Sequence, residues 1–546
     1  MKISTLLVAA LLLGSASSAM AQQEVSKGDL KFEDIIQSSY SQTATPMVVT
    51  SDKNVVVTGT QVVNESLGAF VAKAYSQLGS EAIWKIDITG GRSIVNTIIA
   101  DNAGGVYIGG NFNDEISLGG KTLSGKNSSN YNKTNGFVAH ITSAGKVDAA
   151  YAFVVSANPD MLATYPDAYS QGDKVYCSLS SLTLINGKPY AGLIFTDVLS
   201  SADGKETLTS GTWDCINYGM GVGSDADFAV VELDPTTLEA KSFPVVFGGN
   251  ETRNTENYWG INVESAKMTS DGETLYFAAT VNGYYSKAVL KVGGEVRDEP
   301  TFKYSGGLNA VYVASVNMAS GICLGKVFDG EYKWSATTSS MVKPEVACLD
   351  VVDNAYLYIG GSFYQNFPFN PSVAAVGNTD IYIAGLNKSD LSLKFAHASG
   401  YDEKTAGENN DEKFSCYTVS DPNLSFCGAV VTHNDYYSAA TTTSPLRFYV
   451  SSFAESTATV NDETQDGIEF MTGAVKGLDG ECNYYAKLSN DQTDIYYFYD
   501  GEPVNGISTL KADASDSQAV YNLQGMKLRA PQKGLNIIGG KVVVVK

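Results

Sequence analysis

Acidic side chains stand at the turns of this chain, where a pair of them could hydrolyse glycosidic bonds. Asp114-Glu115 and Asp353 lie beside short strand-like runs, and a glycosidase needs one carboxyl group as acid and a second as base or nucleophile. Asp101 and Asp271 occupy turn positions similar to that of Asp353, and an aspartate at a repeated turn position commonly caps the turn. A carbohydrate-active hydrolase with paired carboxylates is therefore the alternative hypothesis, and we assign no catalytic residue.

Three aromatic side chains could instead form a binding surface. Trp213 lies in a long insertion rich in Ser, Thr and Gly, and Tyr258-Trp259 follows the polar run Asn254–Asn257. Exposed tyrosine and tryptophan rings stack on sugars and anchor protein partners. These three rings are the candidate ligand-binding residues. The competing interpretation is that they seal insertions onto the body of the protein, because large aromatic side chains are mostly buried.

Other catalytic and metal-binding patterns are missing from the sequence. Its three histidines, His140, His397 and His433, offer few bases for a Ser-His-Asp or Cys-His arrangement. There is no G-x-S-x-G elbow, H-E-x-x-H motif or phosphate-binding glycine loop. We predict no cofactor and no metal centre. Asp-Asn and Asp-Gly turns could supply oxygen ligands to a structural calcium ion, but no EF-hand spacing supports one.

The cysteines define no framework. Seven occur, an odd number at irregular spacings, and no C-x-x-C pair indicates a zinc ribbon. Cys416 and Cys427 flank the turn Asp421-Pro422-Asn423, where a disulfide across a hairpin is an open alternative.

Charge and the N-terminal segment indicate the setting of the protein. The formal net charge of −22 argues against nucleic-acid binding, which needs clustered Lys and Arg. Residues 1–21 are predicted to be a signal peptide, with Lys2, the apolar run Leu6–Leu13 and a cleavage site between Ala21 and Gln22. No later segment is long and apolar enough to span a membrane. We expect an exported protein at the cell surface, in the medium or in the periplasm.

The elements that must position these residues form a two-part repeat. Asp101–Phe112 (DNAGGVYIGGNF) and Val352–Phe363 (VDNAYLYIGGSF) are its clearest first halves, and Asn135–Gly145 (NGFVAHITSAG) is a clear second half. Strand-like runs with a variable spacer between them are typical of a radial array of small sheets. The sequence thus predicts an all-β fold, a β-propeller of six four-stranded blades over residues 22–505, with seven blades as the alternative. Residues 30–45 would add a strand that closes the ring.

Small residues end each first half, as in Gly109-Gly110, Gly360-Gly361 and Ala278-Ala279. We expect these segments to be the innermost strands, where crowding around an axis would exclude bulky side chains.

The repeats resemble the SBBP-type β-propeller repeats of secreted bacterial proteins, on the segments already quoted and on ISLGGKTLSG from Ile116. After a linker at 506–518, residues 519–546 read as a small β tail with five basic residues and no acid. Val520–Gly525, Lys533-Gly534-Leu535 and Gly540-Lys541 are similar to the type IX sorting tails of exported Bacteroidetes proteins. The resemblance implies a binding or scaffold module, so we expect a non-enzymatic protein with a glycan or protein partner.

Overall fold

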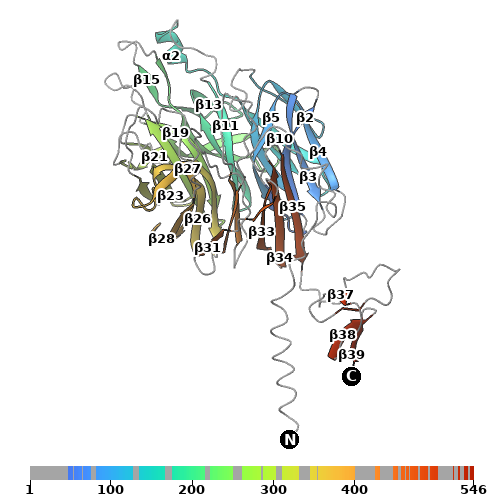
Figure 1. Ribbon diagram of the computed structural model, residues 1–546. Helices are drawn as coiled ribbons and strands as arrows, with labels where there is room; N and C mark the ends of the chain where they lie inside the picture. The colour runs from blue at the N-terminus through green and yellow to red at the C-terminus, as the bar shows by residue number, and fades with distance from the viewer. Residues whose placement is uncertain are drawn as a thin grey trace.

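In the computed structural model (Figure 1) the chain is built almost wholly of antiparallel β-sheets, as the repeats predict. The described helix, α2 (Pro159–Thr164), begins after Asn158, whose side-chain oxygen accepts hydrogen bonds from the N–H groups of Asp160 and Met161. The structure describes residues 47–52, 55–63, 66–74, 82–126, 135–166, 175–214, 222–249, 261–283, 287–302, 310–330, 345–352, 354–399, 425–430, 447–452, 457–460, 463–465, 468–477, 480–489, 492–501, 520–521, 527–528, 534–538 and 541–545.

Seven sheets of three to six strands follow one another in the described part of residues 47–501, and we number them sheet 1 to sheet 7. Sheet 1 contains β1 (Met47–Val49), β2 (Val55–Val63), β3 (Ser66–Ala74), β4 (Ala82–Gly90), β7 (Glu115–Leu118) and β8 (Lys121–Ser124). Sheet 2 contains β5 (Ser93–Ala100), β6 (Val106–Phe112), β9 (Asn135–Ile141) and β10 (Val147–Phe153). Sheet 3 contains β11 (Cys177–Ile185), β12 (Lys188–Phe195), β17 (Asp227–Leu233), β18 (Ala240–Gly248), β21 (Val289–Val292) and β22 (Glu295–Asp298).

The remaining sheets are simpler. Sheet 4 contains β19 (Ile261–Ser270), β20 (Thr274–Gly283), β23 (Ala310–Asn317) and β24 (Cys323–Asp329). Sheet 5 contains β25 (Glu345–Val352), β26 (Tyr356–Asn366), β27 (Ala374–Asn387) and β28 (Leu393–Ser399). Sheet 6 contains β29 (Ser425–Val430), β30 (Arg447–Ser452) and β31 (Thr457–Val460). Sheet 7 contains β32 (Glu463–Gln465), β33 (Ile468–Gly477), β34 (Gly480–Ser489) and β35 (Gln492–Gly501).

Two short ribbons and the tail complete the described strands. The ribbons pair β13 (Val198–Ser200) with β14 (Thr207–Thr209) and β15 (Thr212–Asp214) with β16 (Val222–Ser224). The tail forms its own sheet from β36 (Val520–Tyr521), β37 (Lys527–Leu528), β38 (Gly534–Ile538) and β39 (Lys541–Val545).

The preferred count of six units is wrong for the described residues, because the last stretch makes two sheets rather than one. Its segments Ile468–Gly477 and Gly480–Ser489 pair directly with each other.

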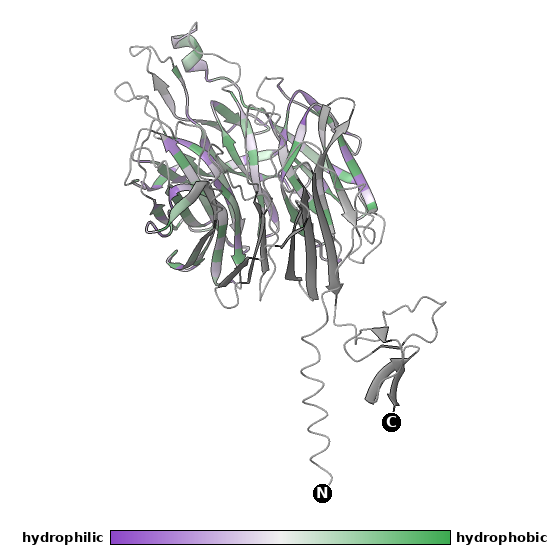
Figure 2. Ribbon diagram, viewed as in Figure 1, coloured by the Kyte–Doolittle hydropathy of each residue, from purple (hydrophilic) through white to green (hydrophobic). Residues whose placement is uncertain are grey.

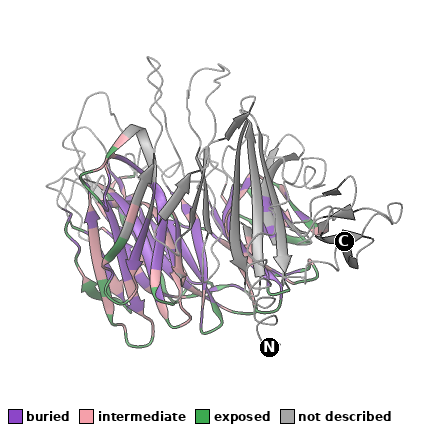
Figure 3. Ribbon diagram, turned by 60° about the horizontal axis from the view of Figure 1, so that its bottom comes forward, coloured by how far each residue is buried: buried purple, intermediate pink, exposed green. Residues whose placement is uncertain are grey.

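The hydrophobic core lies between consecutive sheets. One cluster joins sheets 1 and 2, a second joins sheets 2 and 3, a third joins sheets 3 and 4, and a fourth joins sheets 4 and 5. Apolar and polar residues alternate along many strands (Figure 2), and exposed residues collect at strand ends and turns (Figure 3). Sheets 2, 3 and 4 therefore each bury both faces against their neighbours, as stacked sheets do.

The first strands of sheets 2 to 5, which are β5, β11, β19 and β25, lie side by side. Each carries one β-bulge, at Asn96, Ser180, Glu264 and Ala347 respectively. A bulge inserts an extra residue and leaves it out of the ladder. Sheets 2 to 5 contact their neighbours through these four strands, among others.

The glycine pairs face these bulges. Gly109 and Gly110 lie on β6, opposite Thr97 and Val95, and Gly360 and Gly361 lie on β26, opposite Cys348 and Val346. The expectation that such segments are the innermost strands is wrong, because β6 and β26 are the second strands of their sheets. The physical reason is also different. A Cβ atom on Gly110 would stand 1.9 Å from the carbonyl oxygen of Ile94, so the close backbone of the bulge excludes a side chain.

In sheets 2 to 5 the spacer between the second and third strands folds back onto the preceding sheet. Hairpin β7–β8 adds to β4, and hairpin β21–β22 adds to β18. In sheet 3 the spacer forms backbone hydrogen bonds between Val198 and Ser156, just beyond β10. In sheet 5 the spacer forms no strand, and its Phe369 packs on Phe328 of β24 with ring centroids 4.6 Å apart. Successive sheets are thus linked at their outer edges as well as through the core.

Candidate functional site

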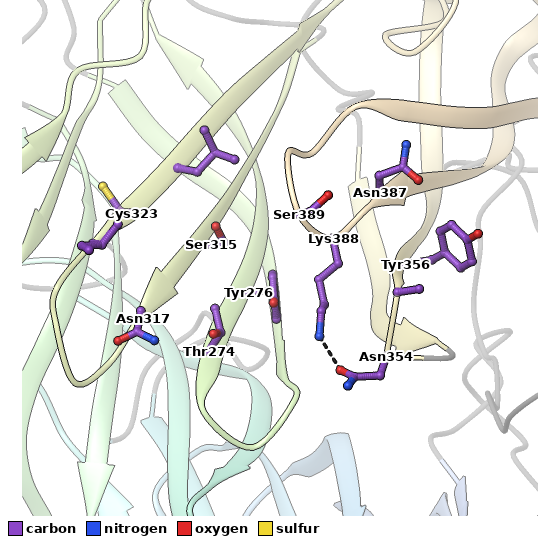
Figure 4. Close-up of a pocket in the computed structure, with 13 residues that line it drawn as sticks. Thr274, Tyr276, Ser315, Asn317, Cys323, Asn354, Tyr356, Asn387, Lys388 and Ser389 are labelled. Carbon is purple, nitrogen blue, oxygen red and sulfur yellow. Dashed lines mark hydrogen bonds between the residues drawn. The ribbon is translucent and has the colours of Figure 1, made fainter.

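A cavity of about 600 Å³ opens between sheets 4 and 5 (Figure 4). It lies where β20, β23 and β24 of one sheet face the ends of β26 and β27 of the next. Its walls are formed by Thr274, Tyr276, Ser315, Asn317, Ile322, Cys323, Leu324, Asn354, Ala355, Tyr356, Asn387, Lys388 and Ser389. The size and the mixture of apolar and hydrogen-bonding groups are those of a small ligand site.

Lys388 crosses this cavity and joins the two sheets. It follows β27, and its Nζ donates hydrogen bonds to Oδ2 of Asp271 at 2.8 Å and to the side-chain oxygen of Asn354. Figure 4 shows its side chain directed toward Asn354, across from Thr274 and Tyr276. Its Nζ lies 6.0 Å from the centroid of the Tyr276 ring. Two of the three ammonium protons are thus engaged by residues of two different sheets.

Asp271 holds Lys388 from the turn between β19 and β20. It accepts hydrogen bonds from the backbone N–H groups of Glu273 and Thr274 and from the Tyr276 hydroxyl. Burial alone would raise the pKa of Asp271, but the hydrogen bonds from Lys388, the two N–H groups and Tyr276 outweigh it and lower that pKa to about 2. Asp271 is a fixed anion at neutral pH.

Several lining side chains have structural roles. Asn317 accepts hydrogen bonds from the N–H and hydroxyl of Ser320, and Asn387 donates to the hydroxyl of Ser392, so both stabilise the turns after their strands. Cys323 has a free thiol, and burial, assisted by the negative field of Asp298, raises its pKa. A protonated thiol is a poor nucleophile.

Two apolar side chains form one lip of the cavity. Ile322 is 72% exposed and Leu324 is 40% exposed, on the turn before β24 and on β24 itself. Ser315 and Thr274 add hydroxyl groups to the same wall. The cavity can therefore accept hydrogen-bonding and apolar groups side by side.

We predict that the Asp271–Lys388 pair makes the protein sensitive to acid. The pKa of Asp271 falls from 3.8 to about 2 on folding, so the unfolded chain takes up the proton first as the pH falls. The stabilisation is complete above about pH 4 and is lost as the pH falls through 2, a change of about 1 to 2 kcal/mol. Denaturant unfolding between pH 6 and pH 2 should show that the free energy of unfolding decreases less in Asp271→Asn than in the wild type. Glu273→Gln, at the exposed neighbouring carboxylate, should show the same pH dependence of the unfolding free energy as the wild type. The same pH dependence in Asp271→Asn would contradict the role of the Asp271–Lys388 pair.

A second polar network lies between the bulged strands. Nζ of Lys267 on β19 donates to the carbonyl oxygen of Ser180 at 2.7 Å and approaches that of Asn96 at 3.5 Å. Both acceptors are bulge residues, one on β11 and one on β5. Burial lowers the pKa of Lys267, and the field of Glu345 opposes this. One lysine thus connects the first strands of sheets 2, 3 and 4.

The aromatic and signal-cleavage candidates are only partly placed. Trp213 lies in β15, opposite Gly223 of β16, and its side chain is outside the description. Tyr258, Trp259, Ala21 and Gln22 lie outside the described residues.

The acidic candidates do not form a catalytic pair where they are described. Asp114 has a left-handed backbone, with φ of 68°, and the adjacent Glu115 is exposed and accepts a hydrogen bond from Ser124. Asp101 accepts hydrogen bonds from the N–H groups of Ala103 and Gly105, as a turn-capping aspartate does. Asp353 lies outside the described residues.

His140 is held between two carboxylates. Its ring nitrogens lie 2.9 Å from Asp101 and 2.7 Å from Asp148, and its ring contacts Tyr107 at 4.5 Å between centroids. No serine or cysteine takes part in this set of contacts. His397 lies on β28 without a described side chain, and His433 is outside the described residues.

Among the described side chains, no group of three acidic, histidine or cysteine residues is placed to hold a metal ion. Cys177, Cys323 and Cys348 are free thiols. The suggested partners Cys416 and Cys427 are, respectively, outside the description and placed in β29 by backbone only. Within the described residues no helix is both long and apolar enough to span a bilayer.

Comparison with known proteins places the chain in no family. No family model matches it, and no curated protein matches it. Among solved structures it is similar to an ulvan lyase described as a new family of polysaccharide lyase, at 10% identity and a TM-score of 0.39, covering 85% of this chain and 95% of that one. It is also similar to Sqt1 from Chaetomium thermophilum, at 11% identity and a TM-score of 0.34, covering 86% and 99%. These are distant similarities.

Proposed function

We propose that this protein is an exported, non-enzymatic β-propeller that binds a glycan or protein partner in the cleft between sheets 4 and 5. The observation that carries the proposal is the cavity beside Lys388, where an ammonium group is held in place by two sheets. The third N–H of the Lys388 ammonium group and the hydroxyl of Ser315 are not used in the described contacts and can form hydrogen bonds with a ligand. Such fixed polar groups beside apolar side chains give a site its specificity.

The propeller itself is part of this proposal. Seven sheets stand in chain order, and the first strands of sheets 2 to 5 lie side by side with a bulge in each. Continuing that arrangement through sheets 6 and 7 would close a ring of seven blades, which removes the free sides of the first and last sheets. Loops on such a rigid body suit ligand binding.

The chemistry of the cleft favours binding over the hydrolase alternative. None of its lining residues is a carboxylate, and the nearby Asp271 has a pKa of about 2. A glycosidase acid must hold a proton near neutral pH, which requires a raised pKa.

A cavity-filling substitution tests this function. We expect Ser315→Tyr to lower the affinity for any ligand found in a glycan and protein-partner screen at least tenfold. Ser117→Tyr, at a partly exposed serine on β7 of sheet 1, should bind as the wild type does. Trp213→Ala and Trp259→Ala test the aromatic candidates in the same screen. Affinity that is unchanged in Ser315→Tyr would contradict a ligand site in this cleft.

Export and the role of the tail are further parts of the proposal. The N-terminal segment and residues 519–546 support it by their sequence patterns. Fractionation of cells that express the chain with and without residues 519–546 would show whether the tail directs the final location.

A further inference from the structure

The outer strand of sheet 4 differs from those of sheets 1, 2 and 3. In sheets 1 and 3 a hairpin from the following unit pairs with the outer strand, and in sheet 2 the following spacer bonds to Ser156, just past β10. Within the described residues the spacer that follows sheet 4 adds no strand to β24, and the ring of its Phe369 packs on Phe328. Within the described residues, β24 pairs with β23 and with no other strand. In the part of the chain that the structure describes, its outward main-chain groups between Cys323 and Phe328 therefore have no partner strand.

Apolar side chains are exposed at the same place. Five large hydrophobic residues of the described chain are exposed, and three of them are Val296 on β22, Ile322 and Leu324. Strands β22 and β24 are in contact, so the three side chains belong to one region. A concentration of exposed apolar residues beside an open sheet edge marks an interaction surface.

The hairpins on the other sheets show what chemistry fits such an edge. In β7 the side chains of Ile116 and Leu118 are buried, and in β21 those of Leu290 and Val292 are buried. Both docking strands thus carry two apolar residues separated by one residue. The exposed Leu324 offers an apolar surface to a strand of this kind.

We propose that β24 is the docking edge for an extended segment of a partner protein, which adds to sheet 4 as β7 and β21 add to sheets 1 and 3. The segment carries an apolar-x-apolar pair, and its main chain supplies the hydrogen bonds. The inference rests on the proposed function, because β24 forms one wall of the cleft, and it names the partner as a peptide segment rather than a glycan.

A synthetic peptide that copies residues 289–298 (VLKVGGEVRD) provides the probe. Calorimetric titration into the full chain should detect binding, and N-methylation of alternate amides in the first four residues should weaken it at least tenfold for one of the two alternate sets. Leu324→Glu should weaken binding at least tenfold. Leu393→Glu is the matched control, because Leu393 is 39% exposed on the outer strand β28 of sheet 5, and it should change affinity less than twofold. Thermal unfolding verifies that both variants are folded.

The outcomes separate this inference from the proposed function. Strand addition at β24 is overturned if neither set of N-methyl groups weakens binding, or if Leu324→Glu and Leu393→Glu change the affinity equally. No peptide binding at about 1 mM, together with a glycan ligand that Ser315→Tyr displaces, overturns the inference and leaves the proposed function standing. Failure of both the peptide and the screen overturns both.

Discussion

Gly110→Ala is expected to destabilise the protein by about 3 kcal/mol or more, because the added methyl group has nowhere to go. The new Cβ would lie 1.9 Å from the carbonyl oxygen of Ile94 and 2.9 Å from its carbonyl carbon. Both atoms belong to the backbone of β5, which cannot move without disturbing the bulge at Asn96 and the contact with β11. The free energy of unfolding from denaturant titration measures this effect.

Gly136→Ala is the matched control for this substitution. Gly136 also lies in a strand of sheet 2, but a Cβ there would meet its nearest neighbour, the side chain of Leu179, at 3.4 Å, an ordinary contact distance. Its unfolding free energy should stay within about 1 kcal/mol of the wild type. Equal stability of the two variants would show that the glycine opposite the bulge is not needed.

Lys267→Met is expected to lower the unfolding free energy by about 2 kcal/mol. Methionine keeps most of the aliphatic stem but removes the donor that the carbonyl of Ser180 accepts from, and an unsatisfied buried carbonyl costs about 1 to 3 kcal/mol. Lys188→Met serves as the control, because Lys188 is 56% exposed and lies 3.4 Å from Glu232. A surface pair of this kind contributes less than about 1 kcal/mol.

The pH dependence of stability tests whether the ammonium group of Lys267 causes the difference in unfolding free energy. Folding lowers the pKa of Lys267 below its usual 10.5. At pH values between the pKa in the folded chain and 10.5, the unfolded chain therefore holds the proton more firmly than the folded chain. The stability of the wild type should therefore rise with pH across that interval relative to Lys267→Met. A constant difference between the two proteins from pH 7 to pH 10 would contradict this role.

Local patterns were enough to predict much of the fold. The turn at Asp101 and the strand at Val106–Phe112 lie where the sequence placed them, as does the strand at Asn135–Ile141, because Gly-rich turns and short aromatic strands have local signals. The tail strands Gly534–Ile538 and Lys541–Val545 also lie within the predicted β segment.

The first strands of the sheets had no such signal. Ser93–Ala100 mixes polar and apolar residues because it faces both a core and the other bulged strands, so its pattern does not mark it as part of the repeat. For the same reason the sequence predicts an innermost position for the glycines opposite it, whereas they lie on the second strand of the sheet.

The cleft also could not be predicted from sequence. Asp271 and Lys388 are 117 positions apart and meet only because sheets 4 and 5 stack. The sequence does place Lys388 locally, because it directly follows Asn387 at the end of a strand of the repeat. Nothing local shows that it reaches into the preceding unit.

The spacers that fold back have a consequence for dissecting the protein. A fragment cut at the end of β18, at Gly248, would lack the hairpin at 289–298 and would present the bare edge of β18 to other molecules. Such a fragment would self-associate through that edge. One extended to Asp298 would cover β18 but would leave β20 without its partner β23. A cut at either place between sheets 3 and 4 therefore exposes a strand edge.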